Sequence, residues 1–132
     1  MRKLTLAFLF LLISAVSAET IEVRGTGKTR DVTLKAGDSL EVRGTGNTLT
    51  VRCEGGGRIE FHGTSNKLVL TGRAEAVDVH GAANHLHLDA QVEYVNIHGS
   101  KNEVVLVRRD KRPLPKVEKH GQGNKVETRD GH

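Results

Sequence analysis

Apolar and polar residues alternate strictly along short stretches of this chain, and the stretches recur. The unit Ile21-Glu22-Val23-Arg24-Gly25 has five later counterparts, whose glycines are Gly44, Gly63, Gly81, Gly99 and Gly121. Each of these five glycines is followed three residues later by an asparagine, and then by a second alternating segment. An alternation of period two is typical of half-buried strands, whereas helices repeat every 3.6 residues. The pattern predicts pairs of short strands joined at a glycine corner.

The spacing of the units predicts how these strands assemble. Successive glycines lie 19, 19, 18, 18 and 22 residues apart, and a fixed period this short indicates a solenoid. We therefore expect an all-β fold, a short parallel β-solenoid or β-helix of about six rungs of 18–19 residues. Stacking at about 4.8 Å per rung places equivalent residues in columns. The predicted core columns are Ile21, Leu40, Ile59, Val77, Val95 and Val117; Val23, Val42, Phe61, Val79 and Ile97; Leu49, Leu68, Leu86, Val104 and Val126; and Val51, Leu70, Leu88 and Leu106.

The corners and the two ends of the repeat carry different residues. Glycine reaches positive φ without steric cost, and asparagine either tolerates that region or hydrogen-bonds to the chain above and below. A structural corner ladder is predicted at Asn47, Asn66, Asn84, Asn102 and Asn124. The first copy has Lys28 at this position, and an insertion at 108–116 with two prolines precedes the last copy. Charge and proline at the ends oppose polymerisation, although end-to-end self-association stays open.

The first 18 residues have the three parts of a secretory signal peptide. A basic start, Met1-Arg2-Lys3, precedes the apolar run Leu4 to Ile13 and a small-residue segment that ends at Ala18. The apolar run is too short to span a bilayer of about 30 Å. We expect cleavage near Ala18 and a mature chain, 19–132, that forms one β-solenoid domain in the periplasm or the medium, without a transmembrane segment.

Composition narrows the choice of partners. Without Arg2 and Lys3 the chain has 18 basic and 16 acidic residues, and aromatic residues make up 3% of the sequence, so nucleic-acid binding is disfavoured. Cys53 is the single cysteine, which excludes an intramolecular disulfide. It falls in the inward position that Gly72 and Ala90 fill in later copies, which predicts a buried, inert thiol.

The repeat resembles a known family. The V-x-V-x-G-x-x-N-x-V-x-V units, the proline-containing insertion before Lys116-Val117 and the final Gly121-Gln122-Gly123-Asn124 are similar to the bacterial family catalogued as domain of unknown function 3060. The resemblance covers essentially the whole mature chain. It implies an exported repeat protein without an assigned activity, so no functional residues are carried over.

Two outward columns on the first strand of each copy are the candidate chemistry. The acidic column is Glu22, Glu41, Glu60, Asp78, Asn96 and Glu118, and the basic column, two residues further on, is Arg24, Arg43, His62, His80, His98 and His120. Like charges stacked at this spacing repel, and a neighbouring column of opposite sign compensates for the repulsion. A pair of compensating surface ladders is the simplest interpretation.

The histidines leave two sharper alternatives open. Imidazole binds zinc, copper and nickel, and consecutive rungs bring His62, His80 and His98 close together with Asp78 or Glu60 beside them. Against a metal site, side chains in a regular ladder point in parallel, and His85 and His87 are expected on another face. The other alternative is acid sensing, because four histidines would add positive charge to one strip below about pH 6.5.

Catalysis and calcium binding have less support. Return turns as short as that of residues 54–57 cannot wall a cleft, and no serine or cysteine has the setting of a nucleophile. The asparagine column lacks the carboxylates that calcium prefers.

We therefore expect a non-enzymatic, exported solenoid without a cofactor, whose flat polar face binds a protein or an envelope polysaccharide. The predicted binding residues are Glu60, His62, Asp78, His80, His98 and His120. The alternative is a periplasmic binder of zinc, copper or nickel that uses His62, His80, His98 and Asp78.

Overall fold

The computed structural model describes residues 19–109 and 111–131, and all of its regular secondary structure is β-strand. The predicted signal peptide, residues 1–18, lies outside the described residues. The strands are β1 (Thr20–Thr26), β2 (Thr29–Leu34), β3 (Ser39–Thr45), β4 (Thr48–Thr64), β5 (Lys67–Ala82), β6 (His85–Ser100), β7 (Glu103–Arg108), β8 (Lys116–Gln122) and β9 (Lys125–Asp130). No helix in the described part of the chain is long and apolar enough to cross a membrane.

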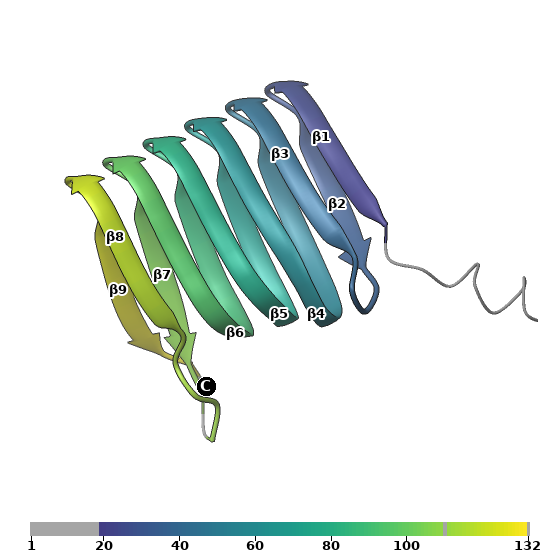
Figure 1. The fold of residues 1–132 in the computed structure, drawn as a ribbon, viewed down its shortest axis with the longest axis vertical. Coiled ribbons are helices and arrows are strands. Elements are labelled where there is room, and N and C mark those ends of the chain that lie inside the picture. Colours follow the sequence, from purple (N-terminus) through teal and green to yellow (C-terminus); the bar gives the residue numbers. More distant parts are fainter. Residues whose placement is uncertain (1–18, 110, 132) are drawn as a thin grey trace, which may run out of the picture.

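The strands form a flattened solenoid of about six coils with two broad faces (Figure 1). The first face consists of β1, β3, the C-terminal halves of β4, β5 and β6, and β8, and the second face of β2, the N-terminal halves of β4 to β6, β7 and β9. Each of the long strands β4 to β6 leaves the second face of one coil and enters the first face of the next. All pairings are parallel. The predicted parallel β-solenoid is confirmed.

The strand register stacks the predicted core columns inside the solenoid. Ile21 pairs with Leu40, Leu40 with Ile59, and the column continues coil by coil to Val117. Phe61 is the largest fully buried side chain, while Val117 and Val126, in the last coil, are only partly buried. Four buried hydrophobic residues were not predicted from the sequence: Leu34, in register with Cys53, and Ala74, Ala76 and Val92, between the two faces.

Close packing of successive coils explains the corner glycines. A Cβ atom at Gly81 would lie 1.8 Å from the carbonyl oxygen of Gly63, and one at Gly63 would lie 1.9 Å from that of Gly44. The two φ angles are 139° and 144°, a region that other residues rarely adopt. Both the backbone conformation and the space therefore require glycine at this position.

The asparagine ladder is confirmed, and the structure selects its hydrogen-bonding role. The amide N–H of Asn66 donates to Oδ1 of Asn84 at 3.0 Å, and Nδ2 of Asn66 donates to the carbonyl oxygen of Gly44 at 3.1 Å. Asn47, Asn66, Asn84 and Asn102 are at most 1% exposed, and Asn124, in the last coil, is partly exposed. Positive φ belongs to the residue before the asparagine, which is Ser65, Ala83 or Lys101 in three coils. The alternative that the asparagines themselves adopt positive φ is therefore wrong.

Charged residues stand at both ends of the core. The side chain of Lys28 lies over Gly25, in the direction where later coils meet the preceding corner carbonyl. Arg30 and Lys119 occupy inward positions of the first and last coils, opposite Leu49 and Ile97, and both are exposed. These residues end the apolar columns, as expected for caps.

Candidate functional site

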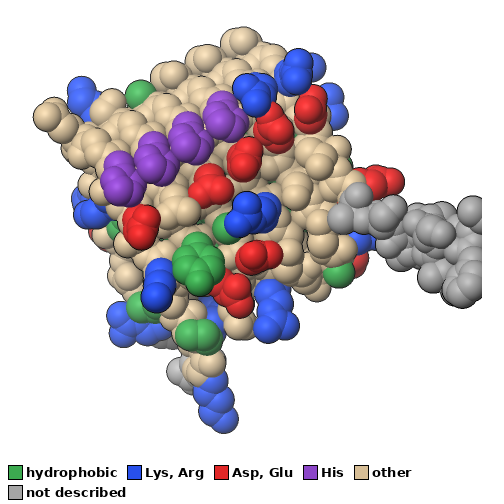
Figure 2. Space-filling view, viewed as in Figure 1, with side chains coloured by type: hydrophobic (Ala, Val, Ile, Leu, Met, Phe, Trp, Pro, Cys, Tyr) green, Lys and Arg blue, Asp and Glu red, His purple; other side chains and the backbone are tan. Residues whose placement is uncertain are grey.

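Four histidines form a continuous stack on the first face. The ring centroids of His62 and His80 are 5.0 Å apart, those of His80 and His98 4.9 Å, and those of His98 and His120 4.7 Å. Neighbouring rings are within 7° of parallel. The stack is possible because consecutive coils pair in register at these positions. In Figure 2 the row of histidines crosses the face with a row of acidic side chains beside it.

The carboxylates beside this row pair with residues of their own strand near both ends of the face. Arg24 contacts Glu22 at 3.1 Å, and Arg43 contacts Glu41 at 2.5 Å. Nε2 of His62 lies 3.5 Å from Glu60, and Nε2 of His120 lies 3.7 Å from Glu118. The two columns therefore run side by side as the sequence predicts, with acid and base adjacent.

The middle of the row differs from its ends. Asp78, on the strand of His80, accepts a hydrogen bond from Nδ2 of Asn96 at 2.9 Å. Asn96 replaces a carboxylate on the strand of His98. As a result, His80 and His98 have no carboxylate partner among the described residues, and both are exposed. The structure thus places all six predicted binding residues on one face, with an uncompensated pair of imidazoles at its centre.

The columns that flank the two ladders are chemically unlike each other. Beyond the histidines lie small or uncharged residues: Thr64, Ala82, Ser100 and Gln122. Beyond the carboxylates lie Arg58, Ala76, Tyr94 and Lys116. Tyr94 is 48% exposed and Ala76 is buried, so an aromatic ring stands above a small neighbour at this edge. Ser39, Glu41, Arg58 and Glu60 help to line a shallow hollow of about 190 Å³ on the same face.

The described residues contain no group of three or more histidine, cysteine, aspartate or glutamate side chains placed to hold a metal ion. His85 and His87 lie in the second-face half of β6, so they do not join the stack. A shared ion would need neighbouring rings to tilt toward each other, because two zinc–nitrogen bonds of about 2.1 Å span less than the ring separation.

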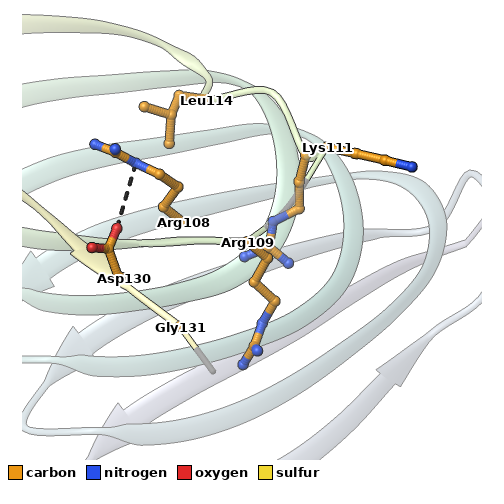
Figure 3. A pocket seen from close by; sticks show the side chains of 7 residues that line it. Arg108, Arg109, Lys111, Leu114, Asp130 and Gly131 are labelled. Carbon is orange, nitrogen blue, oxygen red and sulfur yellow. Dashed lines mark ion pairs between the residues drawn. The ribbon is translucent and has the colours of Figure 1, made fainter.

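The insertion before the last coil lines a hollow that was not predicted from the sequence. Arg108, Arg109, Lys111, Arg112, Leu114, Asp130 and Gly131 line a hollow of about 770 Å³. Among the described residues, the short return turns form no hollow of this size, whereas the insertion forms one. The expectation that no pocket forms is therefore wrong. Figure 3 shows Arg108 reaching toward Asp130, at 3.8 Å, and Lys111 pointing away from the other labelled side chains.

Asp89 of β6 holds this insertion in place. Nε and Nη2 of Arg109 donate to its carboxylate at 2.7 and 2.6 Å, and Nη2 of Arg112 donates to it at 3.0 Å. The hydrogen bond from Arg109, and with it that from Arg112, holds the pKa of Asp89 far below its ordinary value. In the sequence, the only sign of this role is that Asp89 stands where the preceding coils have threonine or arginine in the same column.

Cys53 is buried at the predicted inward position, paired with Gly72. Burial raises the pKa of its thiol to about 11, which keeps it protonated and unreactive at neutral pH.

The family model for a protein of unknown function, DUF3060, matches residues 61–130, which is more than half of the 132-residue chain. The chain belongs to the DUF3060 family. The matched part of this DUF3060 protein includes all four stacked histidines and the insertion. No curated protein and no solved structure matches it. The description of the DUF3060 family assigns no activity, so a functional proposal depends on the geometry of the first face.

Proposed function

We propose that this DUF3060 protein is a non-enzymatic binding protein whose first face takes a linear polysaccharide of the cell envelope. The observation that carries the proposal is Tyr94, an exposed aromatic ring on a flat face of planar polar side chains. The signal peptide predicted at residues 1–18 would bring the protein to the envelope.

The chemistry of the first face suits sugars. A sugar ring presents C–H groups on its faces and hydroxyls at its rim, and an aromatic ring packs against the C–H face through its π-system. Carboxylates, amides and imidazoles beside that ring then accept or donate hydrogen bonds to the hydroxyls. Asp78, Asn96 and His98 are placed in this way, because they lie on the same face in the same coil as Tyr94 or the preceding one.

The same face is poorly suited to the core of a protein–protein interface. Such cores are enriched in aromatic and other apolar residues and depleted of charge. The exposed large hydrophobic residues of the described chain are Val69, Tyr94 and Leu114, and only Tyr94 belongs to the first face. The repeat of the ladder every 4.8 Å or so over about six coils instead matches a polymer that lies along the solenoid axis.

Calorimetric titration of the protein with soluble neutral and acidic polysaccharides tests the proposal. We expect at least one polymer to bind with micromolar Kd, Tyr94→Ala to weaken binding about tenfold or more, and Tyr94→Phe to retain it, because the ring supplies the contact. Val69→Ala, on the second face, is the matched control and should bind as the wild type does. Absence of binding to every polymer, or unchanged binding by Tyr94→Ala, would contradict the proposal.

The second candidate function is metal binding by the histidine stack. The observation that favours it is that four imidazoles lie close together and that Glu60 and Glu118 lie beside the two end rings. Titration with zinc, copper and nickel separates the two functions. This candidate requires micromolar binding that His80→Ala abolishes and His87→Ala leaves intact. The polysaccharide proposal expects no such binding.

A further inference from the structure

We propose that the polysaccharide is acidic and that its binding is linked to proton uptake by the histidine stack, with His80 and His98 as the central anion contacts. This inference rests on the proposed function and names the ligand class and its regulation. It goes beyond the sequence-based idea of acid sensing, because it assigns the anion that the protonated surface accepts.

The charge of the first face depends on its histidines. In the four outward columns of this face, neutral histidines leave four cationic side chains and five carboxylates: Arg24, Arg43, Arg58 and Lys116 against Glu22, Glu41, Glu60, Asp78 and Glu118. The exposed Glu75, Glu93 and Lys119 lie on the same strands outside these columns. The net charge of the columns is then −1. Protonation of four histidines changes the net charge to +3. Protonation of the stack would therefore reverse the sign of these columns, and histidine is the side chain whose charge ordinarily changes between pH 5 and 8.

The charge of the two central histidines is not compensated within the ladder. Glu60 and Glu118 lie beside His62 and His120, whereas Asp78 is hydrogen-bonded to Asn96 and no carboxylate of the described residues pairs with His98. Protonated His80 and His98 would therefore take their counter-ion from outside the protein. The acidic column flanks the stack on one side only, and the uncharged column of Thr64, Ala82 and Ser100 flanks it on the other. On the strand of His98, the member of the acidic column is the uncharged Asn96, so an anionic sugar chain that packs against Tyr94 can reach His98 across Asn96.

The stacked rings are close enough for a charge on one to affect the next. Neighbouring centroids are 4.7–5.0 Å apart, well within a Debye length of about 10 Å, so each protonation disfavours the next. A bound polyanion removes that repulsion and so favours protonation of the stack. Because the linkage is reciprocal, protonation must strengthen polyanion binding to the same extent. Arg43, in register with His62, extends the cationic row with a charge that does not depend on pH.

Polygalacturonate is a suitable probe, and its methyl ester is the matched neutral polymer. We expect polygalacturonate to bind at least ten times more tightly at pH 5.5 than at pH 8.0 at constant ionic strength. Titrations at pH 6.5 in two buffers of different ionisation enthalpy should report a net uptake of protons on binding. The double variant His80→Gln/His98→Gln should lose most of the pH dependence of binding. The control His85→Gln/His87→Gln changes two exposed histidines in the second-face half of β6 and should keep this pH dependence.

The outcomes separate the two proposals. Binding of polygalacturonate without proton uptake, or with the same affinity as its methyl ester, would overturn this inference and leave polysaccharide binding standing. Equal affinity for polygalacturonate and single-stranded DNA would also overturn the inference, because the face would then bind any polyanion. Failure to bind any polysaccharide at any pH would overturn the proposed function itself. The proton-uptake measurement uses the wild-type protein, so a variant that fails to fold does not prevent the test.

Discussion

The glycine corner is the position where a single residue decides whether coils can stack. At Gly81 the backbone has φ 139°, and the space for a Cβ atom is occupied by the carbonyl group of Gly63. The buried Asn84, three residues later, bonds to the same carbonyl oxygen through Nδ2 at 3.1 Å. Glycine and asparagine thus act together: one allows the close approach of two coils, and the other satisfies the backbone groups buried by it.

Gly81→Ala should therefore destabilise the protein by about 3 kcal/mol or more, because the new methyl group forces two coils apart. Gly56→Ala is the matched control: its φ is 64° and no atom of the described residues lies within 4 Å of the added Cβ, so only the conformational cost of about 1 kcal/mol applies. The midpoint of urea unfolding measures both changes. Equal destabilisation by the two substitutions would show that close approach is not the reason for glycine at the corner.

At the scale of an element, the insertion before β8 is the segment that departs from the repeat and is held by long-range contacts. Asp89 of β6 binds Arg109 and Arg112, and Arg112 also donates to the carbonyl oxygen of Val107. These contacts tie the insertion to the second face of the preceding coil. The last coil, β8 and β9, follows directly and is itself held by parallel pairing with β6 and β7.

Asp89→Asn should cost about 1 kcal/mol at pH 7, a value reduced by solvent screening of a partly exposed pair. The native pKa of Asp89 is lowered, so its contribution is complete above the unfolded value of about 3.9 and is lost progressively as the pH falls below it. The stability difference between wild type and variant should therefore narrow on acidification from pH 5 to pH 2.5. Urea unfolding at both pH values measures it.

Asp31→Asn is the control for this prediction, because Asp31 is exposed on β2 and has no ion pair among the described residues. It should change stability little at either pH. A difference for Asp89→Asn that stays constant between pH 5 and pH 2.5 would contradict the proposed role of the carboxylate.

At the scale of the whole molecule, the described part of the solenoid ends at one side in β1 and β2 and at the other in β8 and β9. A second copy could continue the stack by placing its β1 and β2 against β8 and β9, and such a head-to-tail contact does not close. We expect the ends to resist this, because Lys119 and Arg30 interrupt the apolar columns and Lys28 lies over the first corner. Inward charges of this kind are a recognised defence against edge-to-edge association.

The triple variant Lys28→Asn/Arg30→Leu/Lys119→Val should convert these ends into complementary ones. We expect its mass, measured by light scattering after size-exclusion chromatography, to rise with concentration toward linear oligomers, whereas the wild type should not change. The control Lys67→Asn/Arg52→Leu/Arg73→Val makes the same kinds of change on exposed sides of the stack and should behave as the wild type. Equal association of both variants would indicate unspecific aggregation.

Most of the fold was predictable because, in a repeat protein, the place of a residue within its repeat determines where it lies in the structure. Once strands stack in parallel and in register, residues one period apart must lie in one column, so the core, the corner glycines and the asparagine ladder followed from spacing alone. Ala74, Ala76 and Val92 were missed because they lie where β5 and β6 pass from the second face to the first and the alternation that marks inward positions breaks down, whereas Leu34 continues the inward column of Cys53 by one coil.

The sequence by itself determined the coils, their core and the family, since each depends on a repeated pattern. Only the tertiary structure decided that the imidazoles stack ring on ring, that Asn96 takes the carboxylate of Asp78 away from the histidine row, and that Asp89 clamps an insertion 20 and 23 residues away. The physical reason is that side-chain rotamers and an irregular loop follow no period. Their positions depend on which neighbours offer a ring face, a donor or a carboxylate, and that is settled only when the coils have stacked.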